Sequence, residues 1–182
     1  MTEQYFFPDT TVLINFAVIG RLDLLIAYLS GRGRMTQAVQ AEVRKSSRMV
    51  PRLSEFDTVA VCGPAIALNA PADVQSVANI RKRFAALNDP PTKHLGESET
   101  IHVMQSRSEY SLSRVVTEDR DAYRVASALG LLTHNTMEVF QDLVARGELN
   151  AAHAFDLLAA IEDSPYERTL LERPKRPQDL LA

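Results

Sequence analysis

Apolar residues along the chain follow two periodicities. Short β-prone runs occur at 4–8 (QYFFP), 57–61 (DTVAV), 113–117 (SRVVT) and 131–135 (LLTHN). Between these runs, apolar residues recur at spacings of three and four and predict core-facing helix surfaces, for example the set Leu22, Leu25, Ile26 and Leu29. Strands that alternate with helices predict an α/β domain with a largely parallel sheet.

Capping and turn residues set the expected helix boundaries. Thr10 and Thr11 are expected to cap a helix that ends at Gly20, and Thr36 is expected to cap the helix over 37–46. The other boundaries follow from the same signals. Besides the helix after Asp9, helices are expected over 21–30, over 37–46, from 96 onward, and over 120–130, 136–147 and 150–164.

The middle and the end of the chain have weaker patterns. Residues 72–87 show helical spacing that the sequence NDPP interrupts, so we expect 46–94 to form a variable helical insert or flap. A chain of 182 residues with 46% hydrophobic residues can bury one core, and we expect one domain over 1–164. The Pro-rich, basic end predicts a flexible C-terminal tail over 165–182, or a segment that docks on a partner.

Composition restricts the class of protein. The sequence has no signal-like start and no run of about 20 apolar residues, so we expect a soluble, cytoplasmic protein. The single cysteine excludes an internal disulfide framework. The net charge is −3, so affinity for a polyanion must come from a local patch or from metal ions. A basic patch, or otherwise a solvated helix face, contains Arg32, Arg34, Arg44, Lys45, Arg48 and Arg52.

Carboxylates follow two of the predicted strands. Asp9 comes directly after the first strand, and Asp119 follows 113–117 with Glu118 and Asp121 beside it. Because binding sites in parallel α/β sheets form beyond the carboxyl ends of the strands, neighbouring strands would bring these acids into one crevice. Three further acids lie on helices that could line it, namely Glu42, Glu97 and Glu99.

A cluster of carboxylates in a cleft is costly unless a cation neutralises it. A ligand set of carboxylate oxygens, without His or Cys, suits Mg²⁺ or Mn²⁺ rather than zinc. The natural chemistry is then phosphodiester hydrolysis, with water activated by one ion and the leaving oxygen stabilised by a second. The four histidines show no metal-ligand spacing, and phosphate loops and nucleophile elbows are absent from the sequence.

Each acid also has a purely structural interpretation. Asp9, Asp119 and Asp121 are ordinary helix N-cap residues, and Glu97 or Glu99 can simply complement a helix dipole. Glu42 can be a solvated partner of Arg44 or Lys45. The prediction of a metal site therefore depends on the set of acids and not on any one of them.

Four segments of the sequence resemble a PIN domain, the nuclease fold of bacterial VapC-type toxins. They are FPDTTVLINFAVIGRLDLL, VQAEV, LGESETIHVMQ and VVTEDRDAYRVASALGLLTHNTMEVFQDLVARGEL. The resemblance implies a three-layer α/β/α fold around a mostly parallel sheet. Pro8, in place of a plain β-residue, and the segment 46–94 depart from the family pattern.

The resemblance also implies roles for individual residues. Asp9, Glu42, Glu97 and Asp119 would be the catalytic metal ligands, with Asp121 assisting and Glu99 an alternative ligand. Thr117 and Asn15 would support the carboxylates by hydrogen bonds. The residues expected to hold the nucleic-acid backbone are Arg44, Lys45, Arg48, Arg120 and Arg124.

The implied function is a magnesium- or manganese-dependent endoribonuclease, the toxin of a toxin–antitoxin pair. Its expected partners are an RNA substrate, a small antitoxin protein and a second copy of the chain. Two alternatives stay open at this stage. One is a DNA-directed or structure-specific nuclease with the same acids, and the other is a non-catalytic PIN-like scaffold that binds nucleic acid or protein.

Overall fold

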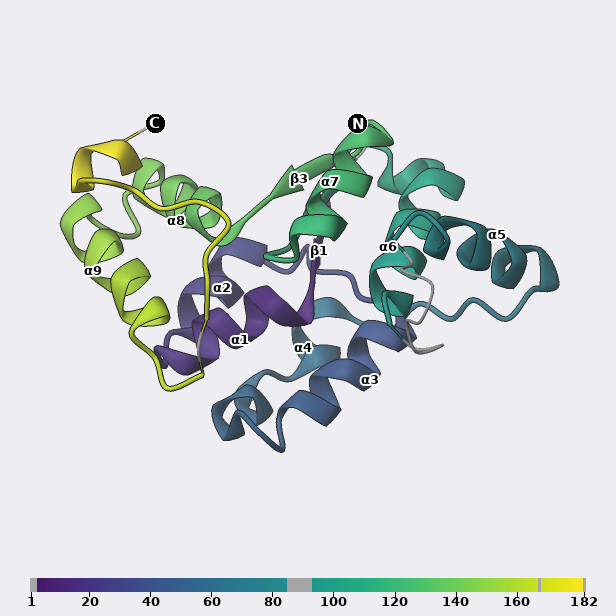
Figure 1. The fold of residues 1–182 in the computed structure, drawn as a ribbon, viewed down its shortest axis with the longest axis horizontal. Helices are drawn as coiled ribbons and strands as arrows, with labels where there is room; N and C mark the ends of the chain where they lie inside the picture. The colour runs from purple at the N-terminus through teal and green to yellow at the C-terminus, as the bar shows by residue number, and fades with distance from the viewer. Residues whose placement is uncertain (1–2, 85–92, 167, 182) are drawn as a thin grey trace.

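A short parallel sheet lies at the centre of the computed structural model, which describes residues 3–84, 93–166 and 168–181 (Figure 1). Within these residues the strands β1 (Phe6–Pro8), β2 (Arg114–Val116) and β3 (Leu132–His134) pair in parallel in the order β1-β2-β3. The register places Val115 opposite both Phe7 and Thr133. The predicted parallel α/β sheet is therefore confirmed.

Helices cover both faces of the sheet. The α-helices are α1 (Thr10–Val18), α2 (Leu22–Leu29), α3 (Gln37–Ser46), α4 (Thr58–Cys62), α5 (Pro71–Arg81), α6 (Leu95–Ser106), α7 (Arg120–Ala128), α8 (Thr136–Ala145) and α9 (Ala151–Glu162). Short 3₁₀ helices are η1 (Pro51–Glu55), η2 (Ser108–Tyr110) and η3 (Pro177–Leu180).

Successive residues of the strands point into two different cores. Phe6 and Val116 pack with α1, α2, α8 and α9, and they belong to the larger cluster of buried apolar residues. Phe7 and Val115 face the other way and pack with α5, α6 and α7. Because side chains alternate along a strand, two buried neighbours require apolar layers on both faces. The three-layer α/β/α architecture expected from the resemblance is thus confirmed.

Isolated bridges extend the sheet beyond β1. Phe6 pairs in parallel with Gly33, and Thr36 pairs in parallel with Ile66. The Phe6 amide donates to the Arg32 carbonyl (3.0 Å), so β1 is bonded on both edges. A Cβ at Gly33 would lie 2.9 Å from the Cys62 sulfur, so glycine permits this close approach. These pairings place β1, which leads to Asp9, in the interior of the sheet.

Several predicted helix boundaries agree with the structure. Thr36 caps α3, and its hydroxyl accepts from the Val39 amide (3.5 Å). Asn135 caps α8 in a reciprocal capping box with Glu138. Gly130, at φ 76°, follows the end of α7 in the left-handed conformation that favours glycine.

Three local predictions are wrong. Residues 57–61, expected as a strand, lie in the short helix α4, because the Asp57 side chain accepts from the Val59 and Ala60 amides (3.0 Å each). Thr10 and Thr11 lie inside α1, which Asp9 caps instead.

The third error is one residue on the predicted core face of α2, where Leu22, Leu25 and Leu29 are buried as expected. Ile26 is 38% exposed, and Leu24 and Tyr28 are buried in its place.

The helix predicted over 72–87 is α5, which ends at Arg81; the NDPP sequence lies outside the described residues.

The described part of 46–94 contains η1, α4 and α5, together with Ile66, which pairs with Thr36. The segment after α9 returns over the domain and packs against α8 and α9 (Figure 1). Leu170 and Leu180 are buried there, and the Gln141 amide group donates to the Asp179 carbonyl (3.0 Å). This segment is therefore docked on its own domain, whereas the sequence predicts a flexible tail or a segment that docks on a partner. Among the described residues, no helix is long and apolar enough to cross a membrane.

We expect Leu180→Ala to destabilise the protein by about 2–5 kcal/mol, because it leaves a cavity under a fully buried side chain. Leu181→Ala is the matched control, since Leu181 is 62% exposed and its truncation removes little packing. Denaturant unfolding of both variants measures the difference. Equal stability of the two variants would show that the C-terminal segment does not dock in solution.

Candidate metal centre

Asp9 lies at the carboxyl end of β1, where its buried side chain is held by three hydrogen bonds. Its Oδ1 accepts from the Thr10 amide (2.6 Å), and its Oδ2 accepts from the hydroxyls of Thr11 (3.0 Å) and Thr117 (2.9 Å). Burial nevertheless raises the pKa of Asp9, against these hydrogen bonds, and the charge of Asp119 raises it further. The structure holds this carboxylate rigidly where its charge is unfavourable.

Asp119 lies beside Asp9 because β2 is the neighbouring strand. It caps α7, with its Oδ1 accepting from the Ala122 amide (2.8 Å). The Thr117 hydroxyl, which donates to Asp9, also accepts from the Asp119 amide (3.0 Å). Thr117 thus ties the two strand ends together, and it supports a carboxylate as the resemblance implies.

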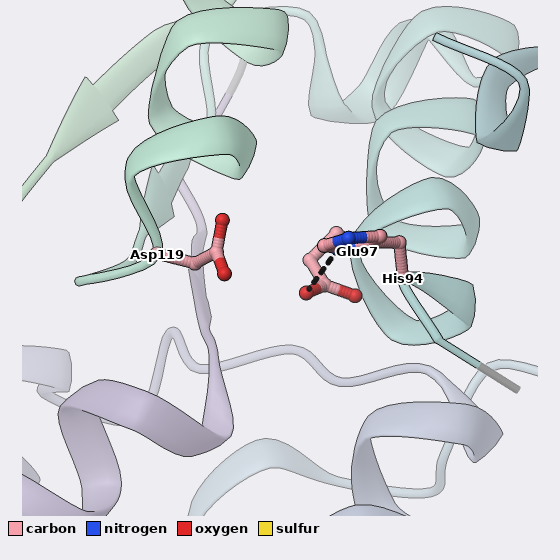
Figure 2. Close-up of side chains that lie close together, drawn as sticks. All are labelled: His94, Glu97 and Asp119. Atoms are coloured by element: carbon pink, nitrogen blue, oxygen red, sulfur yellow. Dashed lines mark hydrogen bonds and ion pairs between the residues drawn. The ribbon is translucent and has the colours of Figure 1, made fainter. Parts of the chain in front are cut away.

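Glu42 and Glu97 approach from the helices α3 and α6. Glu42 accepts from the Thr10 hydroxyl (3.3 Å), and Glu97 lies in the first turn of α6 with its carboxylate opposite Asp119 (Figure 2). A Cβ at Gly96 would lie 2.9 Å from a methyl of Val39 and 3.5 Å from Oε2 of Glu42. The missing side chain at Gly96 therefore lets α6 pack closely against α3, which brings the two glutamates together.

The carboxyl groups raise one another's pKa values. Burial, followed by the charges of Asp9 and Glu97, raises the pKa of Glu42 to about 7. Burial, then Asp9 and more weakly Asp119, raises the pKa of Glu97 to about 6. Carboxylates from four distant segments thus influence one another in a partly desolvated site.

The donor set fits a hard divalent cation. Glu97 Oε2 is buried and has no hydrogen-bond partner among the described residues, although a carboxylate oxygen normally accepts bonds. Asp9, Glu42, Glu97 and Asp119 together supply oxygen donors and excess negative charge, which is the ligand chemistry of Mg²⁺ and Mn²⁺. A bound cation would satisfy the unpartnered oxygen and offset the repulsion.

His94 also lies in this group, although sequence reasoning set the histidines aside. One ring nitrogen of His94 and one oxygen each of Glu97 and Asp119 all lie within 4.8 Å of one another (Figure 2). The three-residue spacing from His94 to Glu97 at a helix start was the available signal, since it brings both side chains to one side of the first turn.

Two predicted auxiliary ligands lie elsewhere. Glu99 accepts from the Ala38 amide (3.1 Å) at the start of α3, so its carboxylate is already engaged outside the group. Asp121 is exposed and forms an ion pair with Arg124 (3.6 Å). Of the two acids of the GESE sequence, Glu97 is therefore the one that faces the centre.

Asn15, expected to support the carboxylates, belongs to a second buried polar network. Its side chain donates to the Thr136 hydroxyl (3.0 Å) and accepts from Arg168 (2.8 Å). Arg168 also donates to the Thr11 carbonyl (3.1 Å), and burial lowers its pKa while the charges of Glu118 and Asp9 oppose this shift. Arg168 therefore brings a positive charge near Asp9 from the C-terminal segment.

Glu118 anchors that segment. Its Oε2 accepts from the Leu171 amide (2.6 Å), its Oε1 accepts from the Thr136 amide (2.5 Å), and its own amide donates to the Thr11 hydroxyl (3.0 Å). The buried carboxylate is thus satisfied by backbone amides and not directed at the metal centre. Sequence alone gave no signal for this role, because the partners are distant along the chain.

The predicted nucleic-acid-binding residues are all exposed, on α3 and just after it or on α7: Arg44, Lys45, Arg48, Arg120 and Arg124. Lys45 shares a pocket with Glu42, a carboxylate of the centre. That pocket, of about 240 Å³, is lined by Glu42 and Lys45 together with Ala38, Ala41 and Leu95. A polyanion in it would contact Lys45 beside the metal centre.

Comparison with known families is consistent with this arrangement. A family model described as a PIN domain (DUF3368) matches residues 6–166. The matched range runs from β1 past the end of α9, and it includes the four carboxylates and His94. It ends before Arg168 and the docked C-terminal segment. No curated protein and no solved structure matches the chain.

The raised pKa values of Glu42 and Glu97 predict how stability depends on pH. Both carboxyls bind protons more tightly in the folded protein than at their ordinary value of 4.5. Their stabilising contribution is therefore complete below pH 4.5 and is lost as the pH rises through about 6 to about 7. We expect the melting temperature of the metal-free protein to fall across this window, and Mg²⁺ to restore it most above the window.

Scanning calorimetry of two variants checks the assignment. Glu42→Gln should flatten the pH dependence, because the amide does not titrate. Glu55→Gln, at an exposed site, should leave it unchanged. If the melting temperature of Glu42→Gln depends on pH as that of the parent protein does, Glu42 is not the source of the pH dependence.

Proposed function

This chain belongs to the PIN domain family of nucleases, and on that basis we propose that it is a magnesium- or manganese-dependent endoribonuclease. The proposal is supported by four carboxylates near the carboxyl edge of the sheet that influence one another's charge. Asp9, Glu42, Glu97 and Asp119 come from separate segments of the chain, and three of them have pKa values raised by burial and by one another's charge.

The four carboxylates would hold the metal, and their neighbours would hold the carboxylates. A divalent cation bound there supplies the positive charge that acidifies an attacking water and stabilises the leaving oxygen of a phosphodiester. The hydroxyls of Thr11 and Thr117 fix the orientation of Asp9, and the Thr10 hydroxyl binds Glu42. In-line hydrolysis at such a site leaves a 5′-phosphate and a 3′-hydroxyl.

The substrate backbone would be held by the exposed basic residues near the centre. Lys45 shares a pocket with Glu42, and Arg44 and Arg48 lie close to it along the chain. Arg120 and Arg124 lie on α7, which begins next to Asp119. Because the protein carries a net charge of −3, these local contacts must supply the attraction for RNA phosphates.

We further propose that the protein is the toxin of a toxin–antitoxin pair and acts as a homodimer. The support for this finer proposal is the resemblance of its motifs to VapC-type toxins. If it is right, expression of the chain alone should arrest growth, and co-expression of a small protein encoded beside it should relieve the arrest. Growth without arrest under confirmed expression would contradict the toxin role.

Asp119→Asn should reduce RNA cleavage by more than about 100-fold, because loss of one carboxylate weakens the binding of the cation and its alignment with the phosphodiester. The measurement is cleavage of single-stranded RNA and DNA with Mg²⁺ and with Mn²⁺. Asp156→Asn is the matched control, since Asp156 is exposed on α9. Chelation of the metal by EDTA should abolish cleavage by the parent protein.

The same assay distinguishes the competing functions. Cleavage of DNA but not of RNA would identify a DNA-directed nuclease with the same centre. Activity that persists in Asp119→Asn would show that the site is not the one proposed here. If neither substrate is cut and the parent binds RNA as well as Asp119→Asn does, the protein is a non-catalytic scaffold.

Lys45→Gln should weaken RNA binding uniformly across sequences, because it removes one phosphate contact. The slope of log affinity against log salt should fall in magnitude by about 0.7, the value for one contact with a single strand. Lys175→Gln, exposed on the segment after α9, should leave the slope unchanged. Fluorescence anisotropy at several salt concentrations measures both, and an unchanged slope in Lys45→Gln would remove Lys45 from the RNA-binding surface.

A further inference from the structure

His94 is built into the metal centre by contacts on both sides of its ring. The residue is buried (8% exposed), and its Nδ1 lies 3.4 Å from Oε1 of Glu97. On the other side, the ring stacks on Phe84 with centroids 4.9 Å apart and planes 16° from parallel. The position and plane of the imidazole are therefore fixed next to a carboxylate of the centre.

The backbone of His94 adopts an uncommon conformation. The residue has φ 58° and ψ 21°, a left-handed conformation that non-glycine residues adopt uncommonly. Such conformations persist where surrounding contacts over-determine them. Here the ring is held by Phe84 and Glu97, and the backbone carbonyl accepts from the Ser98 hydroxyl (2.6 Å) and amide (3.1 Å).

We propose that His94 is a further ligand of the metal centre, so that a ring nitrogen binds the cation together with oxygens of Glu97 and Asp119. The inference rests on the proposed function, because it concerns the same cation. It changes the chemical character of the centre from all-oxygen, as the sequence suggests, to mixed nitrogen and oxygen.

The distances suit a shared ion. Ligand atoms about 2.1 Å from an octahedral cation are about 3 Å apart when adjacent and about 4 Å apart when opposite. The Nδ1–Oε1 separation is 3.4 Å, and the ligand atoms of His94, Glu97 and Asp119 all lie within 4.8 Å of one another. Small side-chain rotations would therefore bring all three to one ion (Figure 2).

Glu97 supplies an independent sign of a missing ligand. Its Oε1 lies near His94, but its Oε2 is buried with no hydrogen-bond partner among the described residues. A histidine that served only to orient Glu97 would leave that oxygen unsatisfied. A cation bound between His94, Glu97 and Asp119 would take up the negative charge and the free lone pairs.

A nitrogen ligand should shift the choice of metal. Imidazole binds transition ions more readily than Mg²⁺, whereas carboxylates suit both Mg²⁺ and Mn²⁺. We expect the protein to bind Mn²⁺ more tightly than Mg²⁺. Replacing His94 should weaken Mn²⁺ binding by about 10-fold or more, as loss of groups around a metal commonly does. Mg²⁺ binding should weaken less.

The test is electron spin echo spectroscopy of the full chain loaded with one equivalent of Mn²⁺, which detects a nitrogen bonded to the ion. His94→Asn is the decisive variant, because asparagine tolerates the left-handed backbone and lacks a ring nitrogen. His153→Gln, exposed on α9, is the control. The expected result is a nitrogen coupling in the parent and in His153→Gln that His94→Asn lacks.

The outcomes separate this inference from the proposed function. Bound Mn²⁺ without a nitrogen coupling in the parent protein would overturn the role of His94 and leave the carboxylate centre intact. A coupling that survives in His94→Asn would also overturn it. Failure of the parent protein to bind Mn²⁺ at all, measured by calorimetry, would overturn both the metal centre and the ligand.

Discussion

The proximity of the carboxylates of Asp9, Glu42, Glu97 and Asp119 is the constraint around which the rest of the site is organised. Burial raises the free energy of the charged forms, and their proximity raises it further, as the elevated pKa values of Glu42 and Glu97 show. Strand pairing and helix packing hold them together, and neither depends on the charge of the carboxylates. Parallel pairing of β1 with β2 fixes two strand ends side by side, and packing of α6 on α3 brings the two glutamates to them.

The neighbours of the carboxylates are of two kinds, uncharged hydroxyl groups and the positively charged side chain of Arg168. Hydroxyl groups of Thr10, Thr11 and Thr117 orient the acids by hydrogen bonds. Because these groups are uncharged, the negative charge of the acids is not neutralised. Arg168 supplies a positive charge from the side of Asp9. Nothing comparable is paired with Glu97 Oε2 in the described part of the chain, and this is the side on which His94 lies. The centre is thus partly compensated on one side and open to a cation on the other.

Local rules were enough to predict much of this arrangement. Strand ends followed by Asp9 and Asp119 are visible in the sequence, and Thr36 and Gly130 mark helix ends by their own chemistry. Helix position alone named Glu42, Glu97 and Glu99 as candidates, and the resemblance to PIN domains was needed to assign Glu42 and Glu97 as ligands. The strand predicted at 57–61 failed because β-branched residues suggested it, whereas the Asp57 side chain captures two amides and starts a helix. The structural roles of Glu118 and Glu99 could not be predicted, because their partners are backbone amides brought near by tertiary packing.

The attachment of the C-terminal segment by Glu118 has a consequence for the order of assembly. The residue next to Asp119 is a buried carboxylate whose amide partners are Thr136 and Leu171. A chain still emerging from the ribosome, with β2 formed but Leu171 not yet synthesised, has no second amide for that carboxylate and no Arg168 beside Asp9. Until then one oxygen of the Glu118 carboxylate has only water, or a bound proton, to satisfy it. Docking of the segment around Leu171 and completion of the acidic edge are in this way energetically linked.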